Sequence, residues 1–147
     1  MNQSNTKSNN VKIIKFLSSA LSIGSAVILL KLLFMHDGYL SIYNKYSITK
    51  NFDPPIDYNF TSFLIFGILE TLLCIVIFIA STFVLKLDEK WRNILIFSLG
   101  ASIIVSFASP KLMYYPYLWS AILSLFLLAI IIFLSRKEIK VLFKKTT

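Results

Sequence analysis

The sequence has few of the side chains from which enzyme and metal sites are built. It contains one cysteine, Cys74, and one histidine, His36, in 147 residues. A lone cysteine cannot form a disulfide within the chain, and a zinc site needs more cysteine and histidine ligands than these two. The four glycines are far apart, so no phosphate-binding loop is present. The sequence therefore excludes a zinc-type metal site, requires no cofactor and favours a role other than catalysis.

Charged residues are also scarce. They make up 15% of the chain, against 56% hydrophobic residues, whereas soluble domains have about a quarter charged residues. Four stretches are long enough, or nearly so, to cross a hydrocarbon core of about 30 Å as helices. Backbone polar groups inside a bilayer must be bonded within their own segment, which favours helices. The sequence predicts an all-α polytopic membrane protein, a single four-helix transmembrane domain over residues 1–147, with spans at 12–34, 60–85, 94–109 and 114–134.

The third of these spans is the shortest. Residues 94–109 would extend only about 24 Å as a helix, and Pro110 limits any extension at the far end. A re-entrant hairpin is the alternative. A full crossing is preferred because the distribution of charge along the chain fits it best.

Basic residues gather on one side of this predicted topology. Eleven of them lie in the N-terminal segment, the second connection and the tail at 135–147: Lys7, Lys12, Lys15, Lys86, Lys90, Arg92, Arg136, Lys137, Lys140, Lys144 and Lys145. The outer loop at 35–59 balances its two lysines with three aspartates. The positive-inside rule then predicts that both termini and the second connection are cytoplasmic in a multi-pass membrane protein. The abundance of asparagine, isoleucine and lysine is typical of an AT-rich bacterial genome, so the expected location is the inner membrane. The net charge of +8 indicates contact with membrane lipid, not with nucleic acid. The polar residues 2–10 are expected to be disordered.

Small and polar residues recur at helical spacing in the second and third spans. Gly67, Glu70, Thr71 and Cys74 fall on one face of the second span, and Ser98, Ser102 and Ser106 occupy every fourth position of the third. In membrane proteins such stripes face other helices, because they allow close approach and hydrogen bonds between helices. We therefore expect a compact bundle with Glu70 directed inward.

Glu70 stands alone in the apolar run FGILETLLCIV. It lies about 15 Å from the start of its span, near the middle of the bilayer, where a carboxylate is costly. Two arrangements relieve that cost. Glu70 can pair with Lys31 near the outer end of the first span, about 10 Å away in depth, or it can stay neutral and bond to hydroxyl groups.

The order of these features resembles the DoxX/MauE-like group of small four-helix bacterial membrane proteins. The matching residues are Lys31 at the end of the first span, Tyr46 in the outer stretch GYLSIYNKYSI, and Glu70 preceded by Leu69. The resemblance implies a membrane component of a redox pathway, with a quinone as a possible ligand. Many members of the MauE type carry a cysteine pair between the third and fourth spans. Here that region reads ASPKLMYYPYLW, so dithiol chemistry is not implied.

Three functions follow from these patterns. The preferred one is an accessory or scaffold subunit that binds another membrane protein, a second copy of itself, or a lipid-soluble redox molecule. The second is a small proton-coupled transporter that uses Glu70. The third is a structural or immunity-type interaction protein in which Glu70 only holds helices together.

Overall fold

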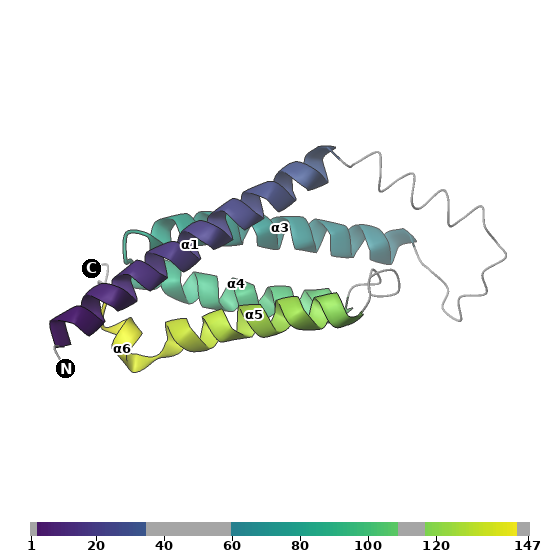
Figure 1. Ribbon diagram of the computed structural model, residues 1–147. Coiled ribbons are helices and arrows are strands. Elements are labelled where there is room, and N and C mark those ends of the chain that lie inside the picture. Colours follow the sequence, from purple (N-terminus) through teal and green to yellow (C-terminus); the bar gives the residue numbers. More distant parts are fainter. Residues whose placement is uncertain (1–2, 35–59, 109–116, 144–147) are drawn as a thin grey trace.

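The computed structural model describes residues 3–34, 60–108 and 117–143, with side chains placed at 6–30, 65–108 and 121–143. This part of the chain is helical apart from its turns, as the sequence predicts (Figure 1). The helices are α1 (Gln3–Phe34), α3 (Phe60–Val84), α4 (Glu89–Ala108), α5 (Tyr117–Ser135) and α6 (Lys137–Lys140). The outer loop at 35–59 lies outside the described residues.

Three of the helices contain segments long and apolar enough to cross a membrane. These segments are Thr6–Leu30, Ile65–Val84 and Glu89–Ala108, and α5 adds a shorter apolar segment, Ala121–Ser135. In the 18-residue window of each long segment only 17 to 22% of the residues are buried inside the protein, and many large apolar side chains are exposed, Ile23, Leu72 and Ile104 among them. An outward apolar surface of this extent suits lipid. The chain is a small multi-pass membrane protein.

The α4 helix begins five residues before the span predicted at 94–109. Asp88 precedes its first turn, and the Asp88 Oδ1 accepts a hydrogen bond of 2.8 Å from the backbone N–H of Lys90. The Asp88 carbonyl accepts the first helical bond, 3.1 Å from the backbone N–H of Arg92. This is the N-cap arrangement that short acidic side chains favour. With its 20 residues, α4 extends about 30 Å, enough to cross the hydrocarbon core.

The first helix is longer than the sequence predicts. It begins at Gln3, so the expectation that residues 2–10 are disordered is wrong over the part described. Serine, asparagine and threonine, which make up most of the residues there, are individually weak helix formers. Adding a turn to an existing helix needs no new nucleus, however, and the membrane-spanning part of α1 already supplies one.

A tight turn joins α3 to α4. The backbone N–H groups of Lys86 and Leu87 donate to the carbonyls of Phe83 and Val84, at 3.0 and 2.9 Å. Leu87 has a φ of 59°, in the left-handed region. The Phe83 and Trp91 rings stack with their centroids 4.6 Å apart, and the Lys86 ammonium lies 5.1 Å from the Phe83 centroid. This cluster fixes α3 and α4 as antiparallel neighbours.

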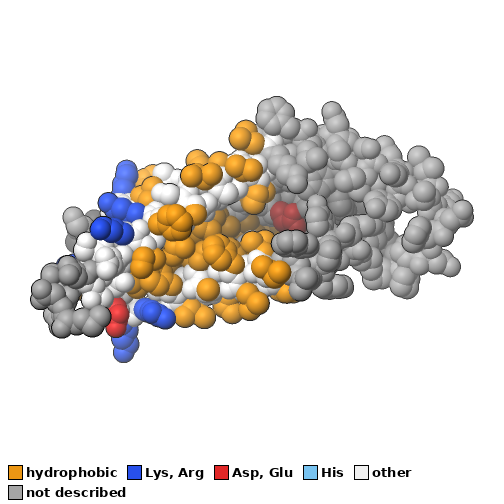
Figure 2. Space-filling model, viewed as in Figure 1, with side chains coloured by type: hydrophobic (Ala, Val, Ile, Leu, Met, Phe, Trp, Pro, Cys, Tyr) orange, Lys and Arg blue, Asp and Glu red, His pale blue; other side chains and the backbone are white. Residues whose placement is uncertain are grey.

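Neighbours in sequence are neighbours in space. The helices α1 and α3, α3 and α4, and α4 and α5 pack side by side, and α6 folds against the end of α5. The start of α1, the α3–α4 turn and α6 lie at one end of the molecule (Figure 1). We call it the basic end, because Figure 2 shows lysine and arginine side chains gathered there beside a broad apolar surface. Its exposed lysines include Lys12, Lys15, Lys86, Lys90, Lys137 and Lys140.

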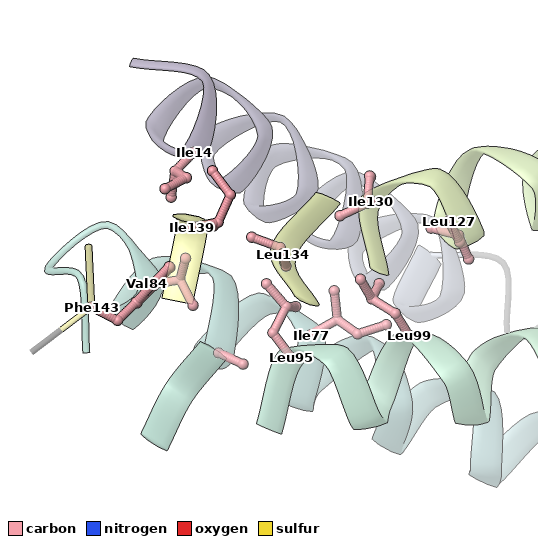
Figure 3. Packing of buried hydrophobic residues seen from close by; sticks show 11 residues of the cluster. Ile14, Ile77, Val84, Leu95, Leu99, Leu127, Ile130, Leu134, Ile139 and Phe143 are labelled. Atoms are coloured by element: carbon pink, nitrogen blue, oxygen red, sulfur yellow. The ribbon is translucent and has the colours of Figure 1, made fainter. Parts of the chain in front are cut away.

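The hydrophobic core occupies the half of the bundle next to the basic end. Figure 3 shows Ile14 of α1, Leu134 of α5 and Ile139 of α6 packed together with Leu95 and Leu99 of α4. No described residue is buried in α1 after Ser25, in α3 before Ile77, in α4 after Leu99 or in α5 before Ser124. We call these segments, residues 26–30, 65–76, 100–108 and 121–123, the far half. The described part of the chain is therefore tightly packed at one end only.

Candidate functional site

Glu70 lies in the far half, ten residues after the start of α3. At about 1.5 Å per residue it is about 15 Å from that end of the helix, as the sequence predicts. It is half-buried, as are Gly67, Thr71 and Cys74, the residues predicted to share its face. The Thr71 hydroxyl donates to the Gly67 carbonyl at 2.8 Å, which satisfies the hydroxyl within its own helix. The carboxylate is thus placed among small and polar groups that are not sealed inside a core.

Two further candidate residues, Lys31 and Tyr46, lie partly or wholly outside the described residues. The backbone of Lys31 belongs to α1, but its side chain lies outside the described residues, and so does the whole of Tyr46. His36 is in the same outer loop as Tyr46. The pairing of Lys31 with Glu70 therefore stays a prediction.

The stripe of small residues is divided between the two halves of the bundle. Ser98 is buried, and its hydroxyl donates to the Leu95 carbonyl at 3.0 Å. Ser102 and Ser106, one and two turns further along α4, are half-buried in the far half. A β-carbon placed on Gly67 would meet no atom within 4 Å. The close helix approach expected at Gly67 is therefore not found among the described residues.

The close contact between α1 and α3 lies nearer the basic end. There the Ser22 and Thr82 hydroxyls are 3.2 Å apart and form a hydrogen bond between the two helices. Ser18 and Ser25 of α1 and Ser81 of α3 are buried nearby in sequence. The Ser22–Thr82 pair thus joins α1 to α3 in the packed half of the bundle.

A second polar cluster surrounds Arg92, which sequence reasoning placed among the basic residues of the cytoplasmic connection. Arg92 is only 4% exposed. Its Nη1 donates to the carbonyl of Leu134 at 2.9 Å, its Nη2 donates to the Asn93 side chain at 2.7 Å, and the guanidinium carbon lies 5.5 Å from the centroid of the Phe143 ring. The sequence signal for this role is that Glu89 and Arg92 are three residues apart, which places them on one face of a helix. In the structure the Arg92 Nη2 is 3.8 Å from the Glu89 Oε1.

The Arg92 cluster explains the fold of the C-terminal segment. The Leu134 carbonyl is one of the last four in α5, which have no partner in their own helix. A buried arginine that donates to it satisfies one such group and places positive charge at the negative end of the helix dipole. Lys140 adds a longer contact, 3.9 Å from Nζ to the Glu89 Oε1, with a side chain that is 58% exposed. The segment at 135–143 is thus part of the bundle, where the sequence predicted only a basic tail.

The described residues contain no group of three histidine, cysteine, aspartate or glutamate side chains that could hold a metal ion. In the far half they offer one carboxylate, one thiol and several hydroxyls. These groups can exchange a proton or form hydrogen bonds with a carbonyl or hydroxyl on a ligand or on a partner helix. Glu70 and its neighbours in the far half are therefore the candidate site.

Comparison with known proteins gives no further guide to function, since no family model, curated protein or solved structure matches the chain.

Proposed function

We propose that this chain is a non-catalytic accessory subunit of a bacterial inner membrane, of the DoxX/MauE-like type, with four spans and both termini in the cytoplasm. Its basic end faces the cytoplasm, because the predicted topology assigns eleven basic residues to that side. Its far half, around Glu70, binds another membrane protein or a lipid-soluble redox molecule such as a quinone.

The observation that carries the proposal is the position of the core. Helices in a finished bundle pack along their length, because contacts between helices and hydrogen bonds between them hold membrane bundles together. Here the buried residues stop at Ser25, Ile77, Leu99 and Ser124, and the polar side chains beyond them are not enclosed. A partner seated on the far half would bury the partly exposed side chains there, Glu70, Thr71 and Ser102 among them.

The test is co-isolation from the native membrane in mild detergent. We expect a stoichiometric membrane protein or a quinone to accompany the chain, and its recovery to fall with Glu70→Gln, which removes the charge and keeps the shape. Glu138→Gln is the matched control, since it makes the same chemical change on an exposed residue of α6. Recovery of the bare chain, or equal recovery with both variants, would contradict the proposal.

A proton-coupled transporter is the second candidate, and the half-buried position of Glu70 favours it. A carboxylate that is neither sealed in a core nor fully exposed can bind a proton and a cationic substrate in turn. In this case Glu70→Gln abolishes proton-coupled flux in proteoliposomes and leaves the protein folded. An unchanged flux in that variant eliminates the transporter.

A further inference from the structure

The first and last helices meet at the basic end through two segments of the same pattern. Residues 12–15 read KIIK in α1, and residues 137–140 read KEIK in α6. In each segment the isoleucine at the third position is buried, Ile14 at 0% and Ile139 at 1% exposed. Figure 3 shows these two isoleucines close together, beside Leu134. The two segments, far apart in the chain, therefore form one apolar seam.

The lysines of both segments lie on the outside of this seam. Lys12, Lys15, Lys137 and Lys140 are all exposed. In a helix that turns by about 100° per residue, the residues two before and one after a buried position both point well away from the core. The directions of these two residues differ by only about 60°. Each helix thus presents its two lysines on one outward side. The only acidic residue within the two segments is Glu138, so the seam carries a clear excess of positive charge.

The seam is held rigid from the inside. Ile139 and Phe143 anchor the C-terminal segment in the core, and Arg92 bonds to the Leu134 carbonyl just before it. Charges on a fixed support lose less conformational entropy when they bind a ligand than charges on a free tail. Val141, next to Lys140, is 81% exposed and offers an apolar contact at the same place. Basic side chains beside an exposed apolar one are typical of elements that lie at the headgroup boundary of a bilayer.

We propose that the seam formed by residues 12–15 and 137–140 is a binding surface for the phosphate headgroups of anionic lipids in the cytoplasmic leaflet. This inference rests on the proposed orientation of the chain and extends it to named residues. Anionic lipid attracts each nearby lysine by about 1 kcal/mol. The lipid is retained by this surface more strongly than by other lysines of the same end.

The experiment counts lipids on the full-length chain in nanodiscs that contain phosphatidylcholine and phosphatidylglycerol. Phosphatidylglycerol retained after transfer to detergent is measured by native mass spectrometry. One variant carries Lys12→Gln, Lys15→Gln and Lys137→Gln. Lys140 is kept because it also contacts Glu89. The control carries Lys7→Gln, Lys86→Gln and Lys90→Gln, which removes the same charge from exposed lysines outside the seam.

We expect the ratio of bound to free phosphatidylglycerol to fall about tenfold or more in the seam variant. In the control variant the ratio should fall much less. Replacing the same three seam lysines by arginine should preserve binding. An equal loss in both glutamine variants would show an effect of net charge alone and overturn the proposal, as would a loss in neither. The assay uses the isolated chain, so its result is independent of whether a partner binds at Glu70.

Discussion

Among the charged side chains of the described residues, Arg92 makes the largest number of identified contacts. It joins α4 to the end of α5 through the Leu134 carbonyl and covers the Phe143 ring. Its Nε is buried without a hydrogen-bond partner among the described residues, which offsets part of this gain. A guanidinium suits the position because its planar group donates in several directions at once, which an ammonium group cannot do with the same geometry.

Replacing Arg92 by alanine should destabilise the protein. The change leaves the Leu134 carbonyl without its charged donor and removes packing from Phe143, so the free energy of unfolding should fall by about 2–3 kcal/mol. Thermal unfolding in detergent measures the effect. Lys90→Ala is the control, because Lys90 is exposed on the same turn of α4. Arg92→Lys should lie between the wild type and Arg92→Ala. Equal unfolding temperatures for Arg92→Ala and Lys90→Ala would show that the Arg92 contacts do not matter to the fold.

At the scale of elements, α6 was the helix that the sequence did not predict. Its four residues are too few to form a stable helix alone, and the run RKEIK looks like part of a basic tail. The structure forms it because Ile139 and Phe143 fall on the core side while the charged residues face outward. Such a short segment takes its structure from tertiary contacts, and no sequence window of its length carries that information.

Truncating Ile139 tests whether α6 belongs to the core. Ile139→Ala should lower the free energy of unfolding by about 2–4 kcal/mol, because it leaves a cavity between α1, α5 and α6. Val141→Ala, two residues away, removes an exposed side chain and should change it by less than about 0.5 kcal/mol. Unfolding in detergent compares the two. A small effect for Ile139→Ala would mean that the segment is not packed against the bundle.

The long helices were predictable because each carries its own signal. An apolar run of about twenty residues with no more than one charge has few alternatives to a membrane helix, and α3 follows the prediction closely. The ends of the helices were less accessible to sequence reasoning. The start of α4 depends on the Asp88 cap, and the apolar run that defined the predicted span begins only at Ile94. The position of Glu70 along its helix was also predictable, whereas its half-buried state depends on how far the core extends.

At the scale of the whole molecule, the proposed orientation places both termini on the cytoplasmic side. A green fluorescent protein fused at the C-terminus should therefore fluoresce, and a periplasmic alkaline phosphatase fused at the same place should be inactive. The same pair of fusions after residue 59, between the first and second spans, should give the opposite result. An active phosphatase at the C-terminus would contradict the orientation.

The molecule combines a packed basic end with a far half in which no described residue is buried, and this asymmetry is the basis of the proposed function. Probes at Ser102 and Phe97 of α4 can distinguish a docked partner from random contact in the bilayer. Ser102 is half-buried in the far half, whereas Phe97 lies beside the packed half with 79% of its surface exposed. Random collisions in the bilayer favour the more exposed residue, and a partner seated on the far half favours Ser102.

The most direct test is photo-crosslinking in native membranes, with a benzophenone amino acid placed at residue 102 or at residue 97. The account predicts a discrete protein or quinone adduct at position 102 and only phospholipid adducts at position 97. Phospholipid adducts alone at both positions would contradict it.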